Sequence, residues 1–469
     1  MTTSRIPFLA LAALAVMAGA VACSTAPARP SAAAAARAAT SAPATSPAAV
    51  ASLPDTPVGA QARWLFGAIV HPPIPAAAIT AHFDKAFLGK VTPAQLNSVL
   101  GQVKTLRLDG ITLSTAAELI MTVTANGQTK LKVSMAADSA GLISGLLLQP
   151  TALPPVPTTW AGVDRQVSSV APEVRMLVAA VNGNACRPIH AIDAGTPAPL
   201  GSAFKLYVLD AVARAAASGK VSWNQQLTIT SQLKSLPSGE LQKEPDGTRV
   251  SVRQAADDMI SLSDNTAANM LTALVGRTAV EQAAAASGMA DPGLDVPFLT
   301  TRELFVLKLI DWPRLADSYL ARSAAGRLAM LTSTIDRVPY STLTAANPAA
   351  WTAPRDIDSL EWFASPTDIC HVYASLATLA RQPGLAPVAA TLQINNGGIG
   401  LDPNRWGPVW FKGGSEPGVL TLNYLATTRG GQSYVVSVLA ENPAVPIAQT
   451  AASLTLLSAI KGAFELAAG

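Results

Sequence analysis

A proline-rich stretch at residues 150–157 separates two longer segments whose apolar residues follow regular patterns. Such stretches join independently folded units, because proline fixes its own backbone dihedral and donates no backbone hydrogen bond. The length of 469 residues also exceeds what one ordinary hydrophobic core supports. We therefore expect two domains, at 56–149 and 159–469, joined by a linker at 150–158.

The first 55 residues predict export and tethering rather than a folded domain. Arg5 precedes an apolar stretch at 6–21, and Cys23 follows directly after Val21-Ala22. Residues 1–23 resemble a bacterial lipoprotein signal, in which Cys23 receives the lipid; an ordinary cleaved signal is the alternative. Residues 24–55, rich in Ala, Pro and Ser, predict a disordered tether. We expect an extracytoplasmic protein that is lipid-anchored to the outer face of the cell membrane, and no run of about 20 apolar residues follows the signal.

Residues 56–149 predict a small α+β domain. Apolar residues at helical spacing occupy 79–103, and three strand-like segments follow at 110–113, 118–123 and 130–135. The residues at 81–88 and 93–96 resemble the N-terminal domain of two-domain actinobacterial serine hydrolases. That resemblance implies an NTF2-like cone. His82 and Asp84 are candidate pocket residues of the cone, and a solvated helix face is the alternative for both.

Residues 159–469 predict one antiparallel sheet with helices packed around it. Strand-like segments occur at 176–181, 420–427 and 433–439, and a helical pattern at 447–466 ends the chain. The residues between 202 and 390 are predominantly helical in pattern, with a helical insertion expected around 304–343. The strands at the two ends of this segment can therefore form one antiparallel sheet with the helices packed around it.

The segment Ser202-Ala203-Phe204-Lys205 can place an amine against a hydroxyl, because residues three apart share one face of a helix. A serine becomes nucleophilic when a neighbouring base takes its proton. The apolar run at 204–212 predicts the burial that lowers a lysine pKa and makes a neutral amine available. The same S-x-x-K spacing recurs at Ser231 and Ser458, so the spacing alone identifies no nucleophile.

Two further motifs distinguish the first match from the other two. Ser263-Asp264-Asn265 occurs once, and Lys412 opens a strand-like segment that continues Gly413-Gly414-Ser415. S-x-x-K, S-D-N and K-T-G together form the signature of class A β-lactamases and penicillin-binding proteins. The second segment resembles this family, which implies an α-β domain of class A β-lactamase type with an all-helical subdomain. The resemblance implies these roles: Ser202 nucleophile, Lys205 base, Ser263 proton relay, Lys412 catalytic lysine, Asn265 and Ser415 substrate-binding residues.

The chain departs from the family pattern in two places. Gly413 stands where the family has a hydroxyl residue that helps bind the substrate carboxylate, which weakens the expected binding of ordinary β-lactams. Ser415 is the expected substitute, and its backbone N–H with that of Ser202 would form the oxyanion hole. No E-x-x-x-N segment lies between Asn265 and Lys412, so the glutamate that clears the class A acyl-enzyme is missing. Glu361 is the best surrogate carboxylate, and a salt-bridged structural acid is the alternative.

These features predict a secreted serine hydrolase that forms an acyl-enzyme at Ser202. The expected substrate is a small ester or amide, β-lactam-like or from the cell envelope, with slow β-lactamase activity. The absence of a G-x-S-x-G elbow argues against the α/β-hydrolase route to the same chemistry. The alternative function is a non-catalytic envelope lipoprotein that binds β-lactams or peptidoglycan.

Composition excludes other partners. The net charge of +3 and the lack of a basic stripe interleaved with aromatic residues exclude a nucleic-acid-binding protein. The histidines and cysteines lack the spacing of a zinc site, so we expect no metal and no cofactor. Cys186 and Cys370 could pair in an oxidising compartment, although their positions in the sequence do not show that they meet. We expect a monomer.

Overall fold

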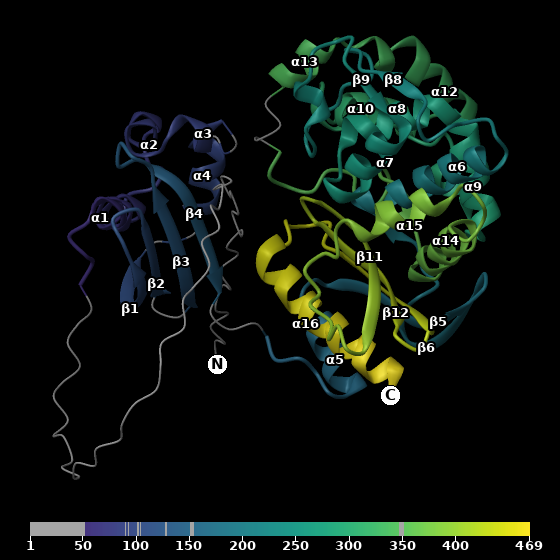
Figure 1. Ribbon diagram of the computed structural model, residues 1–469. Coiled ribbons are helices and arrows are strands. Elements are labelled where there is room, and N and C mark those ends of the chain that lie inside the picture. Colours follow the sequence, from purple (N-terminus) through teal and green to yellow (C-terminus); the bar gives the residue numbers. More distant parts are fainter. Residues whose placement is uncertain are drawn as a thin grey trace, which may run out of the picture. The chain divides into compact units, whose positions relative to one another are not determined.

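The computed structural model describes residues 52–346 and 351–469, except 90, 92, 101–102, 104, 127–128 and 151–153. The chain divides into two compact units, residues 1–153 and 154–469, and each is described by itself (Figure 1). The predicted signal with Cys23 and nearly all of the predicted tether lie outside the described residues.

The first unit packs short helices against a four-stranded antiparallel sheet of order β1-β2-β3-β4. Its first helix begins where the Thr56 side chain accepts a hydrogen bond from Gly59 N (3.1 Å), with Pro57 as the first helical residue. Alternate residues of the second strand, Leu119 and Met121 among them, are buried in the core between sheet and helices. The elements are α1 Pro57–Ile69, α2 Ala76–His82, α3 Lys85–Leu88, α4 Pro93–Leu100, β1 Leu106–Ser114, β2 Glu118–Ala125, β3 Thr129–Ala137 and β4 Ile143–Pro150.

The predicted α+β character of this unit is confirmed, and one strand was not predicted. The helical pattern at 79–103 forms the end of α2 together with α3 and α4, and β4 is an additional strand. Asp84 begins α3, since its carboxylate accepts a hydrogen bond from Phe87 N (2.5 Å). His82 stacks on Trp64 with 3.9 Å between ring centroids, and burial lowers its pKa. Both side chains therefore have local structural contacts; the cone shape and its pocket stay predictions.

The second unit is built on a five-stranded antiparallel sheet of order β11-β12-β13-β5-β6. The antiparallel sheet that the sequence predicted for this segment is confirmed. Helices cover both faces. Met176 and Val178 of β5 face the side covered by α5 and α16, and Leu177 and Ala179 face the side covered by α6 and α14. The strands are β5 Glu173–Asn182, β6 Ala185–Ile192, β7 Ala198–Pro199, β8 Gln226–Thr228, β9 Arg249–Ser251, β10 Phe363–Ala364, β11 Trp406–Glu416, β12 Val419–Thr428 and β13 Ser433–Glu441.

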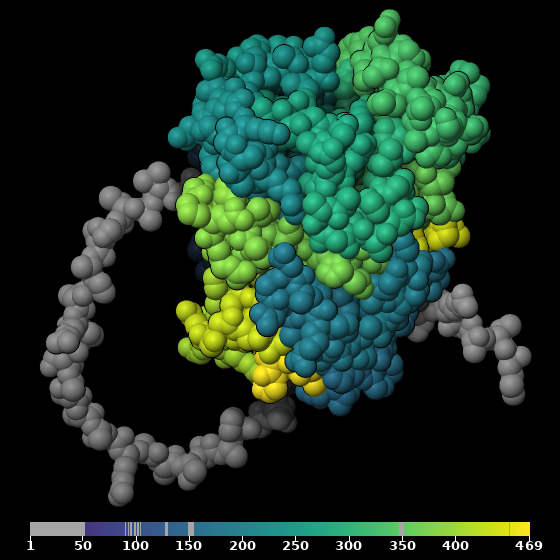
Figure 2. Space-filling model, turned by 90° about the vertical axis from the view of Figure 1, so that its right-hand side faces the viewer, coloured from purple at the N-terminus to yellow at the C-terminus, as the bar shows by residue number. Residues whose placement is uncertain are grey.

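The segment between β7 and β11 is mostly helical, and Figure 2 shows most of these teal and green residues above the blue residues that begin the unit and directly against them. The α-helices are α5 Trp160–Val167, α6 Lys205–Ala217, α7 Val252–Ser261, α8 Asn265–Val275, α9 Arg277–Ser287, α10 Thr301–Leu309, α11 Arg314–Leu320, α12 Ala324–Ser333, α13 Tyr340–Ala345, α14 Pro366–Leu379, α15 Ala386–Gln393 and α16 Gln449–Ala468. The 3₁₀ helices are η1 Gly201–Phe204, η2 Leu241–Lys243, η3 Pro292–Asp295 and η4 Ile335–Arg337.

The terminal helix α16 is a core helix of this unit. Its residues 451–468 are long and apolar enough to cross a membrane, and they are the one such helix among the described residues. Leu456, Ile460 and Phe464 of α16 are nonetheless buried against the sheet. The apolar residues that make this helix long enough to cross a membrane are therefore used in packing against the sheet.

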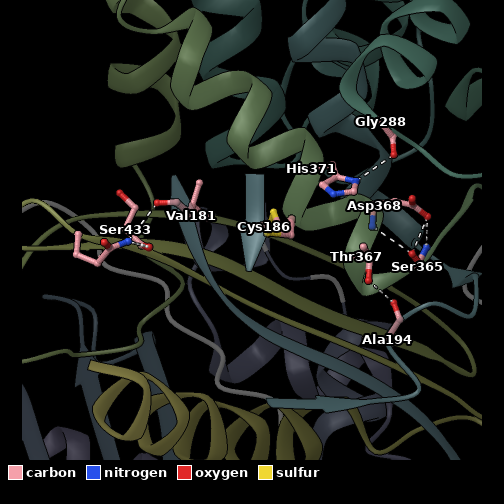
Figure 3. The surroundings of a disulfide bond; sticks show 11 residues. Val181, Cys186, Ala194, Gly288, Ser365, Thr367, Asp368, His371 and Ser433 are labelled. Carbon is pink, nitrogen blue, oxygen red and sulfur yellow. Dashed lines mark hydrogen bonds between the residues drawn. A yellow bond between two sulfur atoms is a disulfide. The ribbon is translucent and has the colours of Figure 1, made fainter. Parts of the chain in front are cut away.

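A disulfide joins Cys186 on β6 to Cys370 on α14, with 6.3 Å between the Cα atoms (Figure 3). The sequence left this pairing open. Hydrogen bonds hold the same end of α14: Ser365 begins the helix with Asp368 in a capping box, and the Thr367 side chain donates to Ala194 O (2.9 Å). The helix is therefore attached to the sheet edge covalently and by hydrogen bonds.

Replacing both Cys186 and Cys370 with serine is expected to lower the free energy of unfolding by roughly 2–5 kcal/mol, because the bond restricts the unfolded chain. Urea unfolding of the double variant and of the oxidised parent measures the difference. An equal midpoint for both, with free thiols absent from the parent, would show that the bond contributes nothing to stability.

Candidate active site

The turn that carries Ser202 is fixed by its backbone. Leu200 N donates to Trp362 O (2.8 Å), and Leu200 O accepts from the Thr421 side chain (3.0 Å). The adjacent strand pair β7–β10 and the stacking of Trp362 on Phe204, 3.8 Å between centroids, support the same turn. Ser202 therefore begins a helical segment whose position does not depend on the serine itself.

Lys205 lies one helical turn after Ser202 and its side chain is buried. Its Nζ is 3.1 Å from Ser202 Oγ and 3.2 Å from Ser263 Oγ, and it donates to Asn265 Oδ1 (2.6 Å) and Ser263 O (2.7 Å). Burial first, and then the positive charge of Lys412, lower the pKa of Lys205 well below its usual value, with Asp264 opposing them. The amine is thus placed to exchange a proton with two hydroxyl groups.

Ser263 joins the two lysines. It adopts a left-handed backbone conformation, φ +56°, which a residue with a Cβ seldom takes and which places its side chain between them. Lys412 Nζ donates to Ser263 Oγ (3.0 Å) and to Gly413 O (2.8 Å). Burial lowers the pKa of Lys412 to about 7. The three side chains form a continuous path along which a proton can move.

Asp264 and Asn265 hold the loop around Ser263. Buried Asp264 begins α8 by accepting from Ala267 N (2.8 Å), and its second oxygen accepts from Glu240 N (2.7 Å) and Leu241 N (2.9 Å). The Asn265 amide nitrogen donates to Leu236 O (3.0 Å). Because its oxygen accepts a hydrogen bond from Lys205 Nζ, Asn265 holds the side chain of the predicted base.

The strand β11 passes directly against the nucleophile turn, and two glycines permit the approach. Gly201 has φ +50°, and a Cβ on it would lie 2.8 Å from Ser415 N. A Cβ on Gly414 would lie 2.1 Å from Leu200 O and 2.7 Å from Ser202 N. Ser415 is exposed at this edge. The backbone segments that carry the two predicted oxyanion donors are therefore neighbours.

Glu361 lies behind the turn. Its Oε2 accepts hydrogen bonds from Gly201 N and Trp362 N, both at 3.1 Å, and its side chain is buried. Lys308 Nζ lies 3.7 Å from its other oxygen. Glu361 thus contacts the backbone of Gly201, the residue before the predicted nucleophile Ser202. Its role in deacylation stays a prediction.

The two other S-x-x-K matches have structural contacts. Lys234 forms an ion pair with Asp246 (2.8 Å). The Ser458 hydroxyl donates to Pro154 O (2.7 Å), and Lys461 donates to Gly400 O (2.7 Å). These contacts distinguish the segment at 202–205 from both matches.

Residues that the sequence did not single out support the site from distant segments. Lys308 of α10 and Glu416 at the end of β11 form a buried ion pair (2.6 Å) beside Glu361. Their separation of 108 residues carries no local pattern, so no sequence signal could have found them. Within the described part of the chain, no group of three or more His, Cys, Asp or Glu side chains is arranged to hold a metal ion.

Two family models match the chain. Residues 176–333 match the Beta-lactamase enzyme family, and residues 53–143 match the N-terminal domain of the ORF 12 gene product. The first match contains the S-x-x-K and S-D-N motifs and ends before Lys412. No curated protein matches the chain.

Similar solved structures include three bacterial β-lactamases. The β-lactamase from Sphaerobacter thermophilus is 21% identical with a TM-score of 0.47, and the match covers 66% of this chain and 98% of that chain. The one from Chitinophaga pinensis is 17% identical with a TM-score of 0.43, over 66% and 98%. The one from Francisella tularensis is 14% identical with a TM-score of 0.45, over 66% and 98%.

Proposed function

We propose that the second unit, whose residues 176–333 match the β-lactamase enzyme family, is a serine hydrolase that forms an acyl-enzyme at Ser202. The observation that supports this proposal most directly is the position of the Lys205 amine, within 3.2 Å of both the Ser202 and Ser263 hydroxyls and buried from water. A surface lysine with its usual pKa would hold its proton and could not act as the base.

The proposed reaction is a two-step acyl transfer. Neutral Lys205 takes the proton of Ser202 Oγ as the oxygen attacks the substrate carbonyl, and the N–H groups of Ser202 and Ser415 stabilise the oxyanion. Ser263 passes a proton to the leaving group and is resupplied by the adjacent lysines. Water then hydrolyses the ester at Ser202, which releases the acid and restores the hydroxyl.

The substrate is a small ester or amide, either β-lactam-like or from the cell envelope. Gly413 offers no hydroxyl for a substrate carboxylate, so hydrolysis of ordinary β-lactams is expected to be slow. We further propose that Cys23 anchors the protein by a lipid to the outer face of the cell membrane, which would place the site near such substrates.

Labelling with a fluorophosphonate followed by mass mapping tests this function. The expected result is one modified residue, Ser202, with labelling lost in Ser202→Ala and retained in the matched control Ser231→Ala. A chromogenic ester and a chromogenic cephalosporin then rank the substrates. Labelling without turnover of either substrate would favour the alternative, a binding lipoprotein, and a parent protein left unlabelled at Ser202 would refute acyl transfer.

A further inference from the structure

Two carboxylates and one lysine form a buried cluster directly behind the nucleophile turn. Lys308, Glu361 and Glu416 come from α10, the segment before β10, and the end of β11. Their side chains are 0%, 1% and 6% exposed. Lys308 Nζ is 2.6 Å from Glu416 Oε1 and 3.7 Å from Glu361 Oε1.

The cluster sets the ammonium of Lys308 against two buried carboxyl groups. One ammonium cannot neutralise two ionised carboxylates, and an uncompensated buried charge is strongly unfavourable. Burial, and next the charge of Glu361, raise the pKa of Glu416 well above its usual value, although Lys308 opposes the shift. Each member of the cluster therefore depends on the other two, and removal of one leaves buried charge without its partner.

The cluster is attached to both backbone segments that flank the reaction centre. Glu361 accepts from Gly201 N, and Gly201 immediately precedes Ser202. Glu416 immediately follows Ser415 in β11. Lys308 links the two carboxyl groups and so links the two segments.

We propose that Glu361, Lys308 and Glu416 are positioning residues, which keep the Ser202 and Ser415 N–H groups at the spacing that stabilises the oxyanion. This inference rests on the proposed acyl transfer and adds the structural basis of its oxyanion hole. Glu361 Oε2 is occupied by two backbone N–H groups and its side chain is almost fully buried. These contacts favour positioning over activation of water, which requires a carboxylate that water can reach.

Glu361→Ala and Glu361→Gln separate the two roles, because a glutamine oxygen can still accept the Gly201 N–H but an amide cannot act as a base. For positioning, Glu361→Ala slows both acylation and deacylation by roughly 10- to 100-fold, since a small displacement of the donors affects both tetrahedral intermediates. Glu361→Gln keeps both rates within about threefold of the parent. Stopped-flow measurement of the burst and steady-state phases with a chromogenic ester gives both rates.

Glu416→Ala provides a second test and is expected to slow both steps as Glu361→Ala does. The matched control is Glu303→Ala, which breaks another buried ion pair of α10, with Arg277 at 2.6 Å, and should leave both rates unchanged while lowering the melting temperature. An equal loss in Glu361→Gln and Glu361→Ala confined to deacylation, or an equal loss of both rates in Glu303→Ala, would overturn the inference. These outcomes differ from failure of the proposed function, in which the parent is not acylated at Ser202.

Discussion

Lys205→Met is expected to reduce the rate of Ser202 acylation by about 10²- to 10⁴-fold, the range typical of a lost general base. The amine contacts both hydroxyl groups of the path, so its removal leaves Ser202 and Ser263 without a proton acceptor between them. The rate of fluorophosphonate labelling under excess reagent measures the loss directly. Methionine has nearly the length of lysine and fills the space of its buried aliphatic stem, which limits the change in packing.

Lys205→Arg is the matched control for charge. An arginine keeps the positive charge and the hydrogen-bond donors but does not lose its proton in proteins, so acylation should fall as far as in Lys205→Met. Labelling of Lys205→Arg at a rate near that of the parent would mean that position 205 supplies charge rather than a base. The proposed mechanism would then need another proton acceptor.

Acylation is expected to rise with pH and then to level off at a pH well below the usual lysine pKa, because the attacking step needs a neutral Lys205 amine. Burial lowers the pKa of Lys412 to about 7 and holds that of Lys205 well below its usual value. The two amines share Ser263 Oγ, so they titrate as a coupled pair. Below the apparent pKa the rate should fall about tenfold per pH unit, and above it the rate should be constant. Labelling rates from pH 5 to 9 test this.

The variant Lys412→Met tests whether the titrations of the Lys205 and Lys412 amines are coupled. Removing the positive charge of Lys412 removes one cause of the lowered Lys205 pKa, so the midpoint of the acid limb should move to higher pH. The prediction concerns the midpoint of the pH profile and not the rate on its plateau. Lys412 also belongs to the proposed reaction path, so its loss can lower the plateau rate directly. A midpoint that stays in place in the variant would show that the two amines are not coupled.

The contacts among Ser202, Lys205, Ser263 and Lys412 could be predicted from the sequence, whereas the residues that support them could not. Ser202 and Lys205 are three residues apart at the start of a helix, so local geometry alone brings them together. Ser263 and Lys412 were predictable because their motifs belong to one signature. The cluster of Lys308, Glu361 and Glu416 exists only through tertiary packing between separate elements, and such contacts leave no periodic pattern.

In the fold as well, the elements with a regular local pattern could be predicted from the sequence, and those without one could not. The alternating strands β2 and β3 and the terminal strands of the second unit were predicted close to their observed bounds. The strand β4 was not, because its sequence is an apolar run around Gly145 without regular alternation. The apolar spacing at 79–103 indicated helical structure but not the start of α3 after Asp84, which depends on a side-chain hydrogen bond.

The strand order of the second unit determines when the site can be assembled. β5 is synthesised near the beginning of this unit and pairs with β13 near its end; Arg175 and Glu441, which form an ion pair between them, are 266 residues apart. Pairings of such high contact order form slowly, because a long loop must close before any contact stabilises it. A growing chain therefore carries its reactive serine without the finished sheet. A product truncated just after Ser415 would contain every candidate site residue and would still lack β12 and β13, the strands between β11 and β5 in the sheet.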